Sequence, residues 1–373
     1  MDHVQYLRCL MCGVEYDPAK VEYVCPDHGD DGVLDVVYDY DLLRSRVSRS
    51  SVADGDGMWR FRQLLPVEPD TPVPLLPVGD TPLIPAPRLA SSAGVAEVWI
   101  KDEGRQPTAS LKDRASAMAV VKATERGTTT LVTASTGNAA AALAGLCAST
   151  GARAVIFVPA AAPQAKIAQL HAFGAAVVLV DGSYDQAVEL AMSAAAQRGW
   201  YNRSTGFNPY MTEGKKTAVY EVCEALGWSA PDAITVGVGD GSIIGGLHKG
   251  LRDLLALGWI DRMPRLIGVQ AEGSAYLADA WRRDEDVVTK PAIVAHTVAD
   301  SIAAGLPRDR IKAMAAVRDT GGGFVTVSDD EILAAIPAMA RGSGVFAEPA
   351  AAAAWAGVKA AVADNMVRPS DRV

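Results

Sequence analysis

A lysine followed by an acid–base pair lies in the stretch "EGRQPTASLKDRASA", which covers residues 103–117. Lys112 comes directly after a Pro-Thr-Ala-Ser turn and before a segment of helical composition. An amine at a strand-to-helix turn is either an ordinary surface cation or a nucleophile that can form an imine with a carbonyl carbon. The chemistry offered by the neighbouring loops decides between these two interpretations.

A second polar loop consists of Ser135, Thr136, Gly137 and Asn138, between the apolar run "TTLVT" and an alanine-rich segment. Ser, Thr and Asn at the start of a helix commonly cap its free amides, and that structural role alone explains them. The loop also offers hydroxyls, an amide and backbone N–H groups at the positive end of a helix dipole. Such a set of donors suits a carboxylate.

A third loop, "GVGDGS", covers residues 237–242. It is neither the GxGxxG dinucleotide fingerprint nor a Walker loop, because it lacks the required glycine spacing and the GK[ST] element. Closely spaced glycines before a helix still let backbone amides surround a phosphate, although a plain tight turn is the alternative. Together the three loops supply an amine, a carboxylate site and a phosphate site, as pyridoxal phosphate and an amino-acid substrate require.

The elements that must position these loops form an alternating pattern from residue 97 onwards. Short β-branched runs, separated by alanine-rich segments of helical length, are "EVWI", "TTLVT", "RAVIFVP", "AAVVLVD", "AITVGVG" and "RLIGVQA". Continuous apolar strands between helices predict parallel sheets that are covered on both faces. In such folds, ligand sites lie at the carboxyl ends of strands. The predicted class is α/β, with two open, mainly parallel sheets flanked by helices around a cofactor cleft.

Local signals also predict where two helices begin and end. Gly199 follows a segment with apolar residues at three- and four-residue spacing and predicts its end. Ser328 and Glu331 form a capping box at the start of "SDDEILAAIPAMARG". Residues 41–90, in contrast, are rich in proline and predict an arm without long regular elements.

Three of the five cysteines lie in the first 25 residues. Cys9 and Cys12 form a CxxC pair, and Cys25 and His28 follow as a second pair, a spacing typical of zinc ribbons. Four thiolate and imidazole ligands leave no open position on zinc, so the metal would be structural. A ribbon without metal, held by packing alone, is the alternative. Residues 1–40 are predicted to form this small zinc-ribbon-like segment.

The composition excludes several classes of function. The chain has 373 residues and a formal net charge of −9, which disfavours binding to nucleic acid and to anionic membrane surfaces. The first residues lack the apolar core and cleavage site of a secretory signal. The most apolar stretch, residues 139–162, is interrupted by Gly145, Gly151 and Arg153, and predicts a buried helix and strand rather than a membrane span. We expect a cytoplasmic protein that acts on a small molecule.

The ordered set of motifs resembles the threonine synthase group of the tryptophan-synthase-β-like, or fold type II, pyridoxal phosphate enzymes. That family has a "PTGSFKDR" lysine motif, to which "PTASLKDR" at residues 107–114 is similar. It also has a serine–glycine–asparagine loop like residues 135–138 and a glycine-rich phosphate loop like residues 237–242. "NPYMTEGKKTAVYE", "TVADSI" and "EPAAAAAWAG" are similar to further family segments, and many members begin with a cysteine-bearing ribbon. The resemblance covers nearly the whole chain.

The resemblance implies a role for each matched residue. Lys112 would form the internal aldimine with pyridoxal 5′-phosphate and later move the proton at the substrate Cα. Asn138 would donate to the 3′-oxygen of the cofactor. The cofactor phosphate would be bound by Val238, Gly239, Asp240, Gly241 and Ser242. The substrate would be bound by Ser110, Ser135, Thr136, Gly137 and Asn138. Asp113 and Arg114 are interpreted as local support for the lysine turn.

The resemblance also implies a domain organisation and a reaction. Residues 1–40 would form the ribbon, residues 41–114 and 207–373 a large cofactor-binding domain, and residues 115–206 a small mobile substrate-binding domain, in a homodimer. The reaction would be that of a carbon–oxygen lyase of the threonine synthase type. It would deprotonate the Cα of O-phosphohomoserine or a related activated amino acid, eliminate a leaving group, and add water or another nucleophile.

Two alternatives remain open at this point. One is β-replacement or β-elimination on serine-like substrates, as in cysteate synthase-like enzymes or threonine and serine dehydratases. The other is a non-catalytic scaffold whose ribbon binds a partner. Intact Lys112 and Asn138 and both anion-binding loops argue against the scaffold.

Two features depart from the family pattern. Many threonine synthases have an arginine in an "NPYRxEG" segment that helps to bind the substrate phosphate, whereas Met211 stands there in this chain. The expectation is that O-phosphohomoserine is used poorly unless Arg203, Lys215 or Lys216 substitutes, and that Met211→Arg improves its use. The sequence also ends at Val373, before the family's threonine–glycine segment that meets the pyridine nitrogen.

Overall fold

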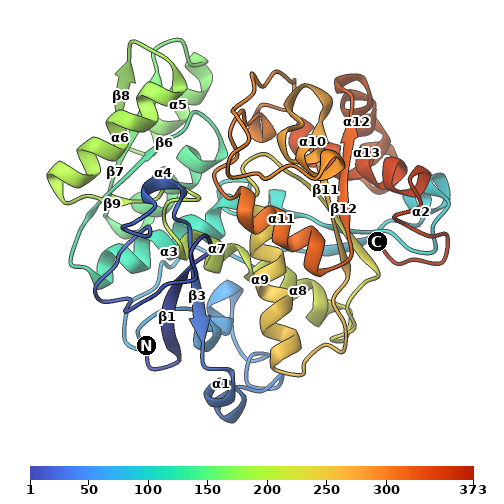
Figure 1. Cartoon of the computed structure of the whole chain (residues 1–373), viewed down its shortest axis with the longest axis horizontal. Helices are drawn as coiled ribbons and strands as arrows, with labels where there is room; N and C mark the ends of the chain where they lie inside the picture. The colour runs from blue at the N-terminus through green and yellow to red at the C-terminus, as the bar shows by residue number, and fades with distance from the viewer. The chain divides into compact units, whose positions relative to one another are not determined.

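The chain, described here over residues 1–373 by a computed structural model, divides into two compact units (Figure 1). The first unit comprises residues 1–80 and 103–217, and the second comprises residues 81–102 and 218–373. Each unit contains a parallel sheet with helices packed against it. The predicted division at residues 40, 114 and 206 concerns cofactor binding and mobility, and it stays a prediction.

The first unit begins with a small antiparallel sheet in the order β2-β1-β3. Its strands are β1 (Val4–Cys9), β2 (Glu15–Tyr16) and β3 (Leu34–Tyr38), and helix α1 (Tyr40–Arg46) follows. Leu7 of β1 and Val36 of β3 are register partners, and both side chains are fully buried. This sheet therefore forms a small apolar layer that supports the cysteine-bearing turns.

A four-stranded parallel sheet in the order β8-β7-β6-β9 forms the body of the first unit. Its strands are β6 (Thr130–Ala134), β7 (Arg153–Pro159), β8 (Ala176–Val180) and β9 (Tyr201–Asn202). The helices around it are α3 (Lys112–Glu125), α4 (Asn138–Thr150), α5 (Gln164–Ala172), α6 (Tyr184–Arg198) and α7 (Tyr210–Lys215). The three β-branched runs predicted in this region are strands, and residues 139–162 contain the predicted helix and strand.

The core beneath α6 explains the apolar side chains on one face of these runs. Val132, Val155 and Phe157 of the sheet pack against Ala187 and Ala191 of α6. The small alanine side chains let the helix backbone approach the sheet closely. α6 ends as predicted, because Gly199 adopts a left-handed φ of 66° at its C-cap.

The second unit contains a three-stranded parallel sheet in the order β10-β11-β12. Its strands are β10 (Ala233–Gly237), β11 (Arg265–Ala271) and β12 (Gly323–Val327). The helices of this region are α8 (Thr217–Ala225), α9 (Ser242–Ala256), α10 (Tyr276–Arg283), α11 (Arg310–Asp319), α12 (Asp329–Ser343) and α13 (Pro349–Ala363). The capping box of Ser328 and Glu331 is present at the start of α12. Strand β12 was absent from the runs that the sequence predicted.

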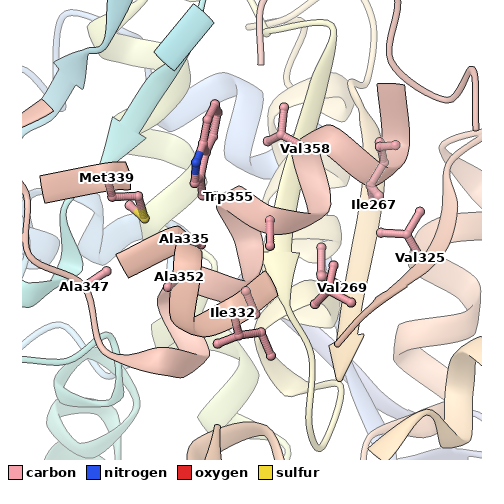
Figure 2. Close-up of a cluster of buried hydrophobic side chains, with 14 of the residues drawn as sticks. Ile267, Val269, Val325, Ile332, Ala335, Met339, Ala347, Ala352, Trp355 and Val358 are labelled. Atoms are coloured by element: carbon pink, nitrogen blue, oxygen red, sulfur yellow. The ribbon is translucent and has the colours of Figure 1, made fainter. Parts of the chain in front are cut away.

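Figure 2 shows the apolar cluster that joins this sheet to α12 and α13. Ile267 and Val269 of β11 and Val325 of β12 lie in one cluster with Ile332 and Trp355. Gly357 permits the close approach of α13, since a Cβ there would lie 2.2 Å from Val269 Cγ2. The packing of α13 thus sets the position of β10 and of the loop that follows it.

The predicted run "EVWI" differs from the other runs in its pairing. It contributes to β5 (Trp99–Lys101), which pairs antiparallel with β4 (Leu83–Pro85) outside the parallel sheet. Helix α2 (Pro87–Ala93) connects the two strands. Proline and short elements in this arm prevent a longer strand. The α/β class with parallel sheets flanked by helices is confirmed. None of the helices combines the length and the apolar character needed to cross a bilayer.

Candidate cofactor and substrate site

The lysine turn lies in the first unit, and Lys112 is the first residue of α3. The Asp113 carboxylate holds the turn, because it accepts hydrogen bonds from the Thr108 backbone N–H at 2.7 Å and from the Thr108 hydroxyl. Within the turn, Ala109 adopts a left-handed φ of 63°. Burial raises the pKa of Asp113, and the hydrogen bonds from Thr108 oppose that shift. These contacts fix the direction in which α3 begins, and with it the position of Lys112.

Arg114 anchors the same turn from the other side. Its guanidinium is fully buried and donates to both Glu103 carboxylate oxygens, at 2.9 and 2.8 Å. It also donates to the Thr217 hydroxyl at 2.9 Å. A bidentate arginine–carboxylate pair is geometrically specific. These contacts fit the interpretation of Asp113 and Arg114 as supports of the lysine turn.

Ser110, two residues before Lys112, has a buried hydroxyl that finds no hydrogen-bond partner in the protein. Buried polar groups in folded proteins almost always have a partner, so an orphaned hydroxyl calls for an explanation. A ligand with polar atoms that lies against the lysine turn would supply one. That Ser110 contacts substrate stays a prediction.

The serine loop connects β6 to α4 in the same unit. The Ser135 hydroxyl accepts from the Gly137 backbone N–H at 3.2 Å, and Gly137 is the N-cap of α4. The N-cap residue Gly137 has no side chain with which to cap the helix, and the positive end of a helix favours an anion. A Cβ at Gly137 would meet no atom within 4 Å. Thr136, Gly137 and Asn138 are all half-buried.

The lysine turn and the serine loop lie on neighbouring elements of the first unit. Helix α3 packs against both α4 and β6. Thr108 of the lysine turn lies against α4, since a Cβ at Gly145 would come within 2.6 Å of its methyl group. The structure therefore brings the predicted amine and the predicted carboxylate loop into one part of the unit.

The glycine loop lies in the second unit, between β10 and α9. Val238 donates its backbone N–H to Val269 at 2.8 Å, and the Asp240 carbonyl accepts from the Asp309 backbone N–H at 2.8 Å. Gly241 is the N-cap of α9 with a φ of 87°, and no side chain caps the helix. Ser242 is the first residue of α9. A glycine loop that leads into an uncapped, 15-residue helix is a favourable site for a phosphate.

Comparison with known proteins identifies the family. Residues 75–373 match the family described as pyridoxal-phosphate dependent enzymes, and this range includes all three loops. The chain is 33% identical to a threonine synthase of Methanocaldococcus jannaschii over 369 residues. This match covers 98% of this chain and 90% of that protein. The chain belongs to the pyridoxal-phosphate dependent enzymes. It is a threonine synthase-like lyase of the fold type II group.

Two further similarities agree with the family. This enzyme is 38% identical over 355 residues to a threonine synthase of Methanosarcina acetivorans, with 95% of this chain and 86% of that protein covered. A solved structure of threonine deaminase isoform 2 from Solanum lycopersicum superposes with a TM-score of 0.67 at 25% identity, over 79% of this chain and 77% of that one. The fold and the sequence thus lead to the same group of enzymes.

The residues present fit pyridoxal phosphate. The first unit offers the Lys112 amine, the orphaned Ser110 hydroxyl and the open end of α4. The second unit offers a loop whose backbone amides precede an uncapped helix. Within each unit these groups have the chemistry that an aldehyde, a carboxylate and a phosphate require.

The predicted metal ligands of this enzyme also converge. The ligand atoms of Cys9, Cys12, Cys25 and His28 all lie within 4.8 Å of one another, and the thiols form no disulfide. Ligands about 2.3 Å from a tetrahedral zinc ion lie roughly 3.5–4 Å apart, close to this spread. Burial acts to raise the pKa of Cys25, but hydrogen bonds with Tyr16 and His28 outweigh it and lower that pKa to about 6.

Sequence reasoning did not single out several residues that hold the lysine turn or join the ribbon to strand β9. Thr108 and Glu103 hold the lysine turn, and the hydroxyl of Tyr23 in the ribbon accepts from the Asn202 backbone N–H at 3.0 Å. Thr108 had a detectable signal, because a hydroxyl residue shortly before an acidic first turn is a common helix-start pattern. Tyr23 had none, since its partner lies 179 residues away.

Proposed function

We propose that this enzyme is a lyase of the threonine synthase type that acts on O-phosphohomoserine or a related activated amino acid. It would remove the proton at the substrate Cα, expel the leaving group, and add water or another nucleophile. The observation that carries this proposal is the similarity to threonine synthases over 95–98% of the chain.

The residues of the first unit would perform most of the binding and proton transfer. Lys112 would hold the cofactor covalently, and its amine, once released by substrate, would move the proton at the substrate Cα. Ser135, Thr136 and Gly137 would orient the substrate carboxylate at the positive end of α4, with Ser110 beside them. Pyridoxal phosphate, when bound, supplies an electron sink that stabilises negative charge at Cα.

Further residues would hold the cofactor itself. Asn138 would donate to the cofactor 3′-oxygen, and its place at the first position of α4 supports that role. The cofactor phosphate would be held by Val238, Gly239, Asp240, Gly241 and Ser242. The fixed backbone of this loop and the uncapped start of α9 support the phosphate role.

A second function is β-elimination or β-replacement on serine-like substrates. The observation that favours it is Met211, at the position where the family pattern has a phosphate-binding arginine. A thioether donates no hydrogen bond to a phosphate. The similarity in fold to a threonine deaminase agrees with this alternative.

A substrate panel separates the two functions. Purified holoenzyme should be assayed with O-phosphohomoserine, O-phosphoserine, serine and threonine, and phosphate, threonine and 2-oxo acids should be measured as products. Release of phosphate together with threonine from O-phosphohomoserine supports the first function. Formation of 2-oxo acids from serine or threonine, without turnover of O-phosphohomoserine, overturns it in favour of the second. Visible absorbance of the purified protein tests the scaffold alternative, because an empty scaffold has none.

We propose that Cys9, Cys12, Cys25 and His28 bind one structural zinc ion. Their convergence within 4.8 Å supports this, and a closed four-ligand site leaves no position for substrate. Metal analysis should find about one zinc per chain. Cys12→Ser should lower the zinc content and the melting temperature and leave kcat nearly unchanged. Absence of metal in a fully active protein would leave packing as the only support of the ribbon.

The remaining expectations concern assembly and mobility. We propose a homodimer, which light scattering of the purified protein tests directly. We also propose that residues 115–206 move as a substrate-binding domain in a cytoplasmic enzyme. Hydrogen exchange that slows in this range upon substrate binding supports the movement, and unchanged exchange contradicts it.

A further inference from the structure

A cavity of about 270 Å³ lies in the first unit, between the ribbon of residues 1–40 and the body that contains the four-stranded sheet. The ribbon contributes Glu22 and Tyr23 to its lining, and the body contributes the C-terminal ends of α3 and α6 together with strand β9. None of the lining residues belongs to the lysine turn, the serine loop or the glycine loop. Pockets for small molecules enclose about 300–1,000 Å³, so this one suits a ligand as small as a single amino acid.

Aromatic rings form much of the cavity wall. The centre of the Tyr23 ring lies 4.9 Å from that of the Phe207 ring and 5.8 Å from that of the Tyr201 ring. Trp200 and Met192 line the cavity as well. Water in contact with such a wall finds few hydrogen-bond partners, whereas an apolar side chain of a ligand gains from burial there.

Helix α6 contributes small residues that leave this space unfilled. Ala195 and Ala196 line the cavity with side chains of a single carbon, and a Cβ at Gly199 would meet nothing within 4 Å. Gly199 is also the C-cap of α6. The carbonyl end of a helix carries partial negative charge, so it favours a positively charged group of a ligand.

Glu22 and Arg126 supply one charge of each sign to the cavity. Arg126, the C-cap residue of α3, forms an ion pair with Glu22, and its guanidinium carbon lies 5.8 Å from the centre of the Tyr23 ring. The Arg126 side chain is 42% exposed and that of Glu22 is 32% exposed. An ion pair so open to solvent contributes little to stability, so a ligand that brings two charges of its own can engage both groups.

These groups together select a zwitterion. A ligand carboxylate suits the Arg126 guanidinium, which can donate two parallel hydrogen bonds to it. A ligand ammonium suits the Glu22 carboxylate and the carbonyl end of α6. An inorganic anion would be repelled by Glu22, and a simple amine would be repelled by Arg126. An apolar side chain on the same ligand would pack against aromatic rings such as those of Tyr23 and Trp200.

We propose that this cavity binds a free α-amino acid with an apolar side chain, whose carboxylate pairs with Arg126 and whose ammonium pairs with Glu22. The site goes beyond the proposed function, because its residues take no part in that reaction. The Tyr23 hydroxyl already joins the ribbon to β9 through the Asn202 backbone N–H. A ligand in the cavity adds contacts across the same junction, so it should raise the melting temperature of the protein.

Calorimetry on the unmodified holoenzyme tests the class of ligand. L-Phenylalanine, L-leucine and L-isoleucine should be titrated, and at least one of them should bind and raise the melting temperature. Its amide lacks the carboxylate and its N-acetyl derivative lacks the ammonium. Each derivative should bind about 10-fold or more weakly, because one charge-assisted contact is lost. A holoenzyme that binds none of the three amino acids at millimolar concentrations overturns the proposal.

Two pairs of matched variants locate the site. Ala196→Phe places a ring in the cavity and should abolish binding, whereas Gln197→Phe, at the next exposed position of α6 and outside the lining, should not. Arg126→Gln should weaken binding about 10-fold or more and remove the preference for the free carboxylate over the amide. Arg198→Gln removes an exposed arginine outside the lining and should leave both unchanged.

Equal binding by the two members of each pair overturns the proposal. If Ala196→Phe fails to fold, the arginine pair decides alone. The same preference for the carboxylate over the amide in Arg126→Gln and Arg198→Gln then overturns the proposal by itself. These outcomes do not depend on which substrate the enzyme turns over.

Binding at the cofactor is distinguished from binding in this cavity by a chemically blocked enzyme. Borohydride reduction fixes the cofactor to its lysine, so the amine of an added amino acid can no longer displace it. The reduced holoenzyme should keep its affinity for the amino acid and the dependence of that affinity on Arg126. Binding that disappears upon reduction belongs to the active site and overturns the proposal.

Discussion

Glycine is used for opposite reasons in the two loops that begin α4 and α9. In the second unit, a Cβ at Gly239 would lie 2.8 Å from the Ile302 Cα, and a Cβ at Gly241 would lie 2.8 Å from the Ala313 Cβ. Both glycines are thus required by the packing of the protein itself. In the first unit, a Cβ at Gly137 would meet nothing within 4 Å, and the φ of −117° there lies outside the left-handed region.

This difference separates a loop shaped by the protein from one that leaves room for a ligand. The glycine loop of α9 has its backbone fixed by neighbouring segments, so its amides are preorganised before any ligand arrives. The serine loop of α4 has open space at Gly137, one of the residues that are proposed to bind the substrate carboxylate. The comparison predicts that substitutions in the glycine loop of α9 weaken folding and cofactor binding. Substitutions in the serine loop of α4 should instead weaken substrate binding.

The largest expected effect tests whether the glycine loop of α9 binds the cofactor independently of Lys112. Lys112→Ala should reduce kcat by about 10³-fold or more, because the proton transfer at Cα loses its base. The protein should still bind pyridoxal phosphate, since the glycine loop of the second unit does not depend on the amine. Turnover measurements and cofactor content after gel filtration check both statements.

Borohydride reduction and peptide mapping identify the lysine directly. In the unmodified enzyme, the label should be found on Lys112 alone, and the exposed Lys20→Ala variant should react like the unmodified enzyme. Label on Lys101 or Lys122 would contradict the assignment. Both of these lysines already pair with carboxylates, Lys101 with Glu221 and Lys122 with Glu125.

Gly239→Ala should have the next largest effect. The added methyl group meets the backbone of Ile302, which cannot move away as a flexible side chain would, and overpacking of this kind costs about 1–3 kcal/mol. We expect a lower free energy of unfolding and weaker cofactor binding, measured by denaturation and by titration of the apoenzyme. Ile302→Ala should not rescue the variant, because the clash involves backbone atoms. Rescue by that exchange would show that the loop is held by side chains.

The strands and the loops that follow them could be predicted from local sequence, but the packing contacts that distinguish the two loops could not. The runs that form β6, β7 and β10, and the polar or glycine-rich stretches after them, were predicted correctly because period and composition are local properties. The convergence of Cys9, Cys12, Cys25 and His28 followed from spacing in the same way. The roles of the proposed site residues stay predictions.

Contacts between segments distant in sequence lay beyond prediction. No local pattern shows that Ile302 leaves no room for a side chain at Gly239. Nor does one show that the Thr205 hydroxyl accepts from both Arg203 and Lys215. Such contacts depend on how elements pack, which a single sequence does not encode in any period. Strand β12 was missed for a related reason, since its five residues begin with glycine and form only a short alternating run.

Gly137→Ala tests the open loop and should have a smaller effect on stability. With free space around the new methyl group, the free energy of unfolding should change by less than about 1 kcal/mol, the range of a modest helix-cap change. KM for the amino-acid substrate should rise roughly 10-fold if the methyl group weakens one charge-assisted contact to the carboxylate. Cofactor affinity should not change. A fall in cofactor affinity with unchanged KM would reverse the roles assigned to the two loops.

The smallest expected effect concerns a position where glycine is absent although the backbone favours it. Ala109, before Lys112, has a φ of 63°, and a non-glycine residue in this region costs about 1–2 kcal/mol. Ala109→Gly removes that cost. Part of the gain in stability is offset, because glycine raises the entropy of the unfolded chain by roughly 0.4–1 kcal/mol. We therefore expect the variant to be more stable by about 0.5–1 kcal/mol in denaturant unfolding. Ala196→Gly, at an exposed position inside α6, should instead be less stable by about 1 kcal/mol. Equal losses in both variants would mean that Ala109 is not strained, and that the lysine turn is held entirely by its contacts with Asp113.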